Sequence, residues 1–137
     1  MSEDDKESMP DQYKTVSLEE FVEYSKSMFA YWTEDDFAAS FRKMLTIEQF
    51  RSEEMQGLYQ QYLSSGPATY VKDLFESMGI AHAEENAVRF YATMYFYYSV
   101  YDGADDKEKV KNEFASAISN MAQEWIKQPK LTQIRKS

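Results

Sequence analysis

FYATMYFYYSVY, residues 90–101, is the stretch of this chain that constrains its fold most. Seven of its twelve side chains are aromatic. On a helix, two adjacent faces carry most of the large side chains: Tyr91, Tyr95 and Tyr98 on one, and Phe90, Met94, Tyr97 and Tyr101 on the next. A helix that is apolar around most of its circumference must be buried on most of it. The sequence therefore predicts a helix over 83–101 that is covered on several sides, and we expect a second chain to provide part of that cover.

The remaining residues between 17 and 127 also have the three- and four-residue spacing of amphipathic helices. A first helix opens at Ser17, where Glu20 completes a capping box. A second helix is expected after Thr33 and a third after Ser52, because both hydroxyls are good N-caps. Four glycines and three prolines are too few for a turn-rich all-β fold. We predict an all-α domain, a bundle of five to six helices.

Breaks between the later helices coincide with glycine and proline. At Gly66-Pro67 either a new helix begins, since proline is tolerated in a first turn, or one long helix kinks. Gly79 is expected to end the helix that follows. The helix over 83–101 is closed by Asp102-Gly103, and the last helix covers 105–127. For the second helix we predict an inner face of four apolar residues: Phe37, Phe41, Met44 and Leu45.

Charge and composition exclude several classes of function. The 137 residues include 24 Asp and Glu against 15 Lys and Arg, a net charge of −9, which argues against nucleic-acid contact by this chain. The absence of cysteine excludes disulfides, zinc–thiolate sites and a thiol nucleophile. There is neither a membrane-spanning apolar run nor a signal segment, so we expect a cytoplasmic protein with no membrane contact. Residues 1–16 are interpreted as a disordered acidic leader, 17–127 as one helical domain, and 128–137 as a basic tail.

The last two helices each have more than one apolar face, which favours a two-fold four-helix interface between two copies of the chain. The interface is predicted to use Phe90, Met94, Tyr97, Tyr98, Tyr101, Phe114, Ala115, Ile118, Ala122, Trp125 and Ile126. The alternative is a monomer with a tyrosine-rich core.

Three segments, FAASFRKMLTIEQFRSEEMQGLYQQYL (37–63), GPATYVKDLFESMGI (66–80) and FYATMYFYYSVYDGADDKEKV (90–110), are similar to one known family. They resemble the C-terminal regulatory domain of the tetracycline-repressor (TetR) family of bacterial transcription factors, in helix order and number over most of 17–127. That domain senses small molecules and dimerises through its last two helices. The family's N-terminal helix-turn-helix domain, which contacts DNA, has no counterpart in this chain.

The resemblance implies that the chain is a small-molecule-sensing, dimerising domain, with DNA contacted only through a domain missing from this chain. The effector would be a small apolar or aromatic molecule, and the partner a second copy of the chain. A protein-interaction module that dimerises without a ligand, for example with a full-length regulator, is the alternative from another class. A helical-bundle enzyme is a third, weaker alternative.

A ligand pocket would be formed by the earlier helices and the start of the aromatic helix. Glu48 lies on the predicted inner arc of the second helix, where it would select a cationic or hydrogen-bonding ligand, or else reach water or pair with Arg42 or Arg51. Ser25 would line the pocket, or bond back to the carbonyl four residues earlier. The predicted ligand-binding residues are Ser25, Met28, Phe41, Met44, Glu48, Tyr59, Tyr62, Phe75, Tyr91 and Tyr95.

Catalysis and metal binding are not expected. His82 is the sole histidine and is predicted to be exposed in a loop, with no spacing that demands a metal. Residues 102–106 lack the order of a calcium-binding loop. Neither phosphate-binding glycine loops nor a nucleophile elbow occur. We therefore predict no enzyme activity and no cofactor.

Overall fold

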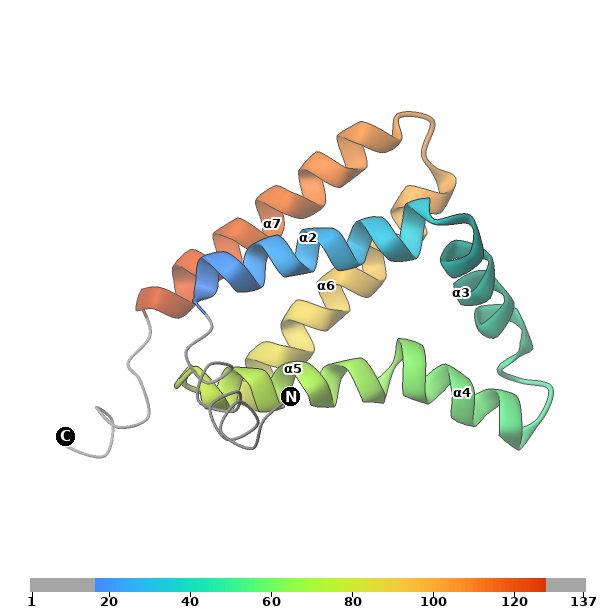
Figure 1. Ribbon diagram of the computed structural model, residues 1–137, viewed down its shortest axis with the longest axis horizontal. Helices are drawn as coiled ribbons and strands as arrows, with labels where there is room; N and C mark the ends of the chain where they lie inside the picture. The colour runs from blue at the N-terminus through green and yellow to red at the C-terminus, as the bar shows by residue number, and fades with distance from the viewer. Residues whose placement is uncertain (1–16, 128–137) are drawn as a thin grey trace, which may run out of the picture.

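Six helices and no strand make up residues 17–127, the part of the chain that the computed structural model describes (Figure 1). They are α2 (Leu18–Glu34), α3 (Asp36–Glu48), α4 (Glu53–Leu63), α5 (Ser65–Ser77), α6 (Ala83–Gly103) and α7 (Lys107–Lys127). The predicted all-α class is confirmed over this range. The predictions for residues 1–16 and 128–137 lie outside the described residues.

The helices form an open triangle with a two-helix layer on one side (Figure 1). Helices α2, α3 and the nearly collinear pair α4–α5 make its three edges, and α3 contacts both α2 and α4. Helix α6 crosses behind, from the end of α5 to the corner between α2 and α3. Helix α7 returns beside α2 and packs on both α2 and α6. The space between α2 and α4–α5 is thus backed by α6.

Local capping explains where several helices begin. Ser17 and Glu20 form the predicted capping box at the start of α2, and the side chain of Ser52 caps α4 by accepting from the Met55 amide at 3.1 Å. The prediction for Thr33 is wrong. Thr33 lies within α2, where its hydroxyl donates to the Phe29 carbonyl at 2.7 Å, and the next helix begins two residues beyond Glu34 with a different cap.

Carboxylates and a left-handed glycine mark three further helix ends. Asp35 caps α3 by accepting from the Ala38 amide at 2.9 Å, in the role predicted for Thr33. Asp106 accepts from the Lys109 amide at 3.1 Å in the first turn of α7. Gly79, with a φ of 77°, follows the last turn of α5 as predicted.

The interruption near Gly66 is a change of helix at Ser64, whose φ of −129° and ψ of −106° are not helical. Helix α5 then begins at Ser65, so Pro67 falls in its first turn, where a missing amide costs little. Gly66 is required here by space, because a Cβ atom would lie 2.1 Å from the Gln61 carbonyl oxygen. Of the two alternatives, a new helix is correct, and it continues almost in line with α4 (Figure 1).

One large apolar cluster, here called the aromatic core, joins α2, α5, α6 and α7. The rings of Phe29 and Phe114 stack with centroids 4.3 Å apart, and those of Phe75 and Trp125 meet edge to face at 4.7 Å. A second, smaller cluster of Leu45, Tyr59 and Leu63 lies between α3 and α4.

The buried face of α3 is rotated by about one residue position from the predicted face and shares only Leu45 with it. Ala38, Ala39, Arg42 and Leu45 are its buried residues, whereas Phe37 is 75% exposed, Met44 is exposed and Phe41 is half-buried. The two alanines allow α3 to approach the end of α2 closely, which turns the larger side chains outward.

The predicted dimer interface also needs correction. Eight of its residues are buried within the single chain, with at most 8% of their surface exposed: Phe90, Met94, Tyr98, Tyr101, Phe114, Ile118, Ala122 and Trp125. They belong to the aromatic core and have almost no surface left for a partner. Of the remaining three, Tyr97 and Ala115 are half-buried and Ile126 is exposed.

Candidate ligand pocket

A pocket of about 260 Å³, here called the aromatic pocket, lies between α2 and the α4–α5 edge, with α6 behind it. All four helices contribute to its wall: Phe21, Tyr24, Ser25, Met28 and Trp32 from α2; Gln61 and Tyr62 from α4; Gly66, Pro67, Tyr70 and Val71 from α5; and Phe90, Tyr91, Met94 and Tyr98 from α6. Eight of these fifteen side chains are aromatic. Flat rings are therefore the surface that a bound molecule would meet.

The structure brings together four of the predicted ligand-binding residues and leaves six outside the aromatic pocket. Ser25, Met28, Tyr62 and Tyr91 line its wall. The others lie elsewhere: Phe75 in the aromatic core, Phe41, Met44 and Glu48 on α3, and Tyr59 and Tyr95 in contact between α4 and α6. Pocket residues that the sequence analysis did not assign to a ligand site include Tyr24, Trp32 and Tyr70, and also Met94, which it assigned to the dimer interface. Helical spacing did not show that α2 and α5 face each other across a gap.

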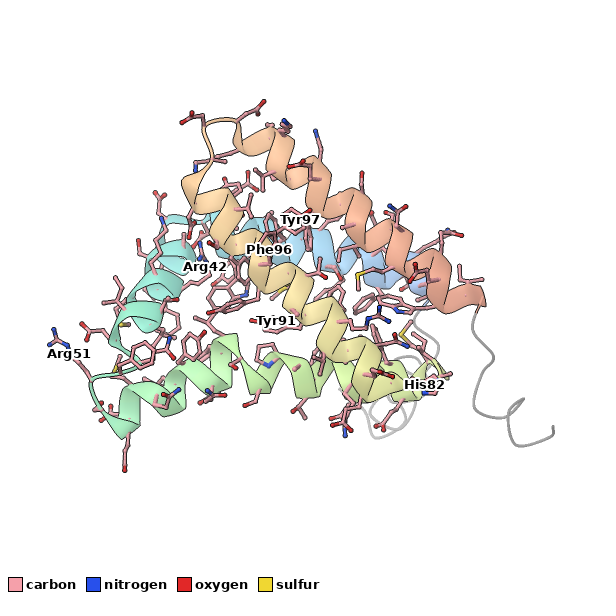
Figure 2. The ribbon with its side chains drawn as sticks, turned by 180° about the vertical axis from the view of Figure 1, so that it is seen from behind. Arg42, Arg51, His82, Tyr91, Phe96 and Tyr97 are labelled. Carbon is pink, nitrogen blue, oxygen red and sulfur yellow. The ribbon has the colours of Figure 1, made fainter. Side chains whose placement is uncertain are left out.

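Glu48 is not a pocket carboxylate. It lies at the end of α3, where its Oε2 atom forms an ion pair with the Nε atom of Arg51 at 2.7 Å. Arg51 is largely exposed and points away from the molecule (Figure 2). This pairing is one of the alternatives that the sequence left open for Glu48. The aromatic pocket therefore has no acidic group from this residue.

Two hydroxyls in the pocket wall already donate to backbone carbonyls. Ser25 donates to the Phe21 carbonyl at 2.8 Å, the back-bonding alternative considered from the sequence. Tyr91 on α6 donates to the Leu63 carbonyl at 2.6 Å, and so ties the last residue of α4 to α6 (Figure 2). Both hydroxyl oxygens keep the capacity to accept a hydrogen bond.

Tyr24 of α2 and Tyr70 of α5 are neighbours in the outer part of the pocket wall. Both side chains are about half exposed, at 46% and 57%. Burial and the Tyr70 hydroxyl raise the pKa of Tyr24. These two tyrosines contribute to the wall from different helices, α2 and α5.

Burial also keeps the tyrosines deeper in the wall uncharged. It raises the pKa of Tyr91, with smaller contributions from the neighbouring Tyr98, Tyr59 and Tyr95 and an opposing one from Arg42. Burial raises the pKa of Tyr98 too, although Arg42 acts in the opposite direction. No Asp, Glu, Lys, Arg or His is among the fifteen lining residues. The aromatic pocket is thus electrically neutral across the physiological pH range.

Arg42 connects three helices through polar contacts, a role that the sequence analysis did not identify. Its guanidinium forms a bidentate pair with Asp102 of α6, at 2.9 and 2.7 Å, and its Nε atom donates to the Trp32 carbonyl at 3.0 Å. The Arg42 Cζ atom lies 4.9 Å from the Tyr98 ring centroid. Figure 2 shows Arg42 between α3 and α6. One buried side chain therefore joins α2, α3 and α6 beside the pocket.

A second hollow, here called the outer groove, lies on the other side of Tyr91, between the α4–α5 junction and the outward face of α6. Its volume is about 630 Å³, and its wall includes Tyr59, Val88, Tyr91, Ala92, Tyr95 and Phe96. Val88 and Phe96 are 54% and 61% exposed. The Tyr59 and Tyr95 hydroxyls hydrogen-bond to each other across it, and burial together with this bond raises the pKa of Tyr59 to about 12.

The structure also bears on metals and membranes. Within residues 17–127, no cluster of three or more His, Asp or Glu side chains is close enough together to hold a metal ion. His82 is exposed directly before α6, as predicted, in a left-handed conformation. None of helices α2 to α7 is long and apolar enough to cross a lipid bilayer.

Comparisons of the chain with models of protein families, with curated proteins and with solved structures found no significant match.

Proposed function

We propose that this chain is the small-molecule-sensing and dimerising domain of a transcriptional regulator of the TetR type. The aromatic pocket carries the proposal. It lies between helices that are far apart in the sequence, and its lining is apolar and aromatic with a few polar atoms, the composition typical of small-molecule sites. DNA contact is assigned to a separate helix-turn-helix domain.

The order of the helices supports the resemblance. Helices α2, α4 and α5 line the pocket together with α6, and α6 and α7 come last, as the resemblance implies for the dimerising pair. Because the inner faces of α6 and α7 are used within the chain, dimerisation is proposed for the outward face of α6. That face carries exposed Val88 and Phe96, with Ala92 between them.

A screen of small molecules tests the sensing function. The chain is heated with a library of neutral, anionic and cationic aromatic compounds, and binders are expected to raise its melting temperature. The pocket-filling variant Met28→Trp should abolish these shifts, while Met44→Trp, an exposed position on α3 outside the pocket, should retain them. A library without any Met28-dependent binder would contradict the sensing function.

Sedimentation tests the dimer. Phe96→Asp places a charge on the outward face of α6 and should convert a dimer into a monomer. Ile47→Asp, at a 73% exposed position of α3, is the matched control and should leave the assembly unchanged. A monomeric wild-type chain at high concentration would contradict the dimer.

A second candidate function is a protein-interaction module that binds no small molecule. The exposed apolar side chains on α3, Phe37 and Ile47, favour it, since they add to those on α6 and are not needed for the pocket. A dimer that Phe96→Asp dissociates, in a chain that binds no library compound, would support this function instead.

A further inference from the structure

We infer that the aromatic pocket takes a neutral, flat, ring-bearing molecule that donates a hydrogen bond from an O–H or N–H group. The inference rests on the proposed sensing function and adds the chemical class of the ligand. Three properties of the wall lead to it: its charge, its rings and the direction of its hydrogen bonds.

Charge excludes an ionised ligand. The wall contains no Asp, Glu, Lys, Arg or His, and burial raises the pKa of Tyr91 and of Tyr98. Arg42, whose guanidinium lies against the Tyr98 ring, is already paired with both carboxylate oxygens of Asp102. A carboxylate or ammonium entering the pocket would lose hydration and gain no counter-charge. The ligand is therefore neutral, although the chain as a whole carries a charge of −9.

The rings and the volume favour a flat molecule of two or three fused rings. Aromatic side chains from all three sides of the pocket, such as Trp32, Tyr62 and Phe90, offer faces and edges for stacking. Met28 and Met94 lie among them, and thioethers adapt to the shape of a ring. A volume of about 260 Å³ is close to the lower limit of about 300 Å³ for small-molecule sites. A compact bicyclic compound is a suitable probe of this space.

Two buried hydroxyls of the wall, those of Ser25 and Tyr91, have their protons directed away from a ligand. The Ser25 proton is directed to the Phe21 carbonyl, and the Tyr91 proton to the Leu63 carbonyl. Each hydroxyl has a single proton, so toward a ligand these two oxygens can only accept. Both side chains are buried, Ser25 with 1% and Tyr91 with 8% of its surface exposed. A ligand with an O–H or N–H group satisfies them, and one with only acceptors does not.

A series of four naphthalenes separates these properties by titration calorimetry on the full chain. The probes are 2-naphthol, its methyl ether 2-methoxynaphthalene, 2-naphthoate, and the cation 2-naphthylmethylammonium. We expect 2-naphthol to bind tightest and the methyl ether about five- to tenfold weaker, since it has lost one neutral hydrogen bond. Both charged compounds should bind about a hundredfold weaker or not at all.

A matched pair of substitutions on α2 locates the acceptor. Ser25 and Thr33 both donate to the carbonyl four residues earlier, but only Ser25 lines the pocket. Ser25→Ala should weaken 2-naphthol about fivefold and leave 2-methoxynaphthalene unchanged. Thr33→Val, which also removes a buried hydroxyl, should change neither affinity. Circular dichroism confirms that both variants fold.

Three outcomes would overturn the inference. They are a methyl ether that binds as tightly as 2-naphthol, a charged compound that binds more tightly, and the absence of any binding in the series. None of them removes the proposed sensing function, which fails only if the broader library contains no Met28-dependent binder. Preference for 2-naphthol that disappears in Ser25→Ala would support the inference.

Discussion

The aromatic core and the corner formed by α3 and α4 are held together in different ways. In the core, stacked and edge-to-face rings such as Phe29 and Phe114 fill the space between helices. At the corner, the small apolar cluster around Leu45 packs α3 on α4, and directional bonds join both helices to α6: those of Arg42 to Asp102 and of Tyr91 to Leu63. A bond of this kind fixes two backbones at a distance without filling the space beside it. The aromatic pocket lies where the two regions meet, because core residues such as Phe21 and Phe90 line it together with Gln61 and Tyr62 of α4.

The sharpest test of the comparison is the same substitution in both regions. Phe114→Ala removes a ring with 1% of its surface exposed and should lower the free energy of unfolding by about 3–5 kcal/mol. Phe37→Ala removes a ring that is 75% exposed on α3 and should change it by no more than about 0.5 kcal/mol. Urea unfolding followed by circular dichroism measures both. Equal losses of unfolding free energy in the two variants would contradict the difference between the aromatic core and the corner.

The corner should respond to the loss of a polar group. Arg42→Met keeps much of the side-chain volume but leaves Asp102 and the Trp32 carbonyl without this donor. Because the Asp102 side chain is 29% exposed and water can reach it, we expect a loss of about 2 kcal/mol in urea unfolding, less than for a fully buried pair. Lys43→Met, on the exposed side of α3, is the control. A loss of unfolding free energy in Lys43→Met but not in Arg42→Met would contradict the stabilising role of Arg42.

Two glycines of the α4–α5 edge should respond in opposite directions. Gly66→Ala brings a Cβ atom against the Gln61 carbonyl and should lower the free energy of unfolding by about 1–3 kcal/mol. At Gly57, within α4, a Cβ atom meets no other atom within 4 Å, so Gly57→Ala should raise it by about 0.5–1 kcal/mol. Thermal melting of the two variants compares them directly. A change in unfolding free energy in the same direction for both variants would show that the α4–α5 junction relaxes to accept the added Cβ atom at position 66.

The smallest expected effect is a change in alkaline stability. The pKa of Tyr59 is raised from about 10 to about 12 in the folded chain, so its contribution to stability is fully present below pH 10 and is lost between pH 10 and 12. Tyr59→Phe should therefore reduce the fall in unfolding free energy over that range. Tyr31→Phe, on the exposed surface of α2, should not. Urea titrations at several pH values measure the slope, and identical slopes for both variants would contradict the shift.

Features set by neighbouring residues were predictable from the sequence. The capping box at Ser17, the cap at Ser52 and the left-handed Gly79 each depend on a few adjacent positions. The error at Thr33 is of the same local kind, because its hydroxyl had a competing carbonyl within its own helix. The all-α class followed from the same local information.

Features set by distant contacts were not predictable in the same way. Helical spacing shows which side chains share a face, but not which helix covers it, so Phe90 and Trp125 were placed in a dimer interface when the chain's own core covers them. Arg42 shares a face with Ala38 and Leu45, a signal of burial, yet its partner Asp102 is 60 residues away. The pocket depends on such contacts, which explains why only four of the ten predicted ligand-binding residues line it and Glu48 does not.

The position of α2 in the core has a consequence for synthesis of the chain. Phe21 and Phe29 emerge from the ribosome before the rings that cover them, Phe90, Phe114 and Trp125 among them, which are translated 69 to 104 residues later. Until then the apolar face of α2 has no core to join. A nascent chain that stalls before α7 would therefore expose this face, where a chaperone could bind it or another nascent chain could aggregate with it.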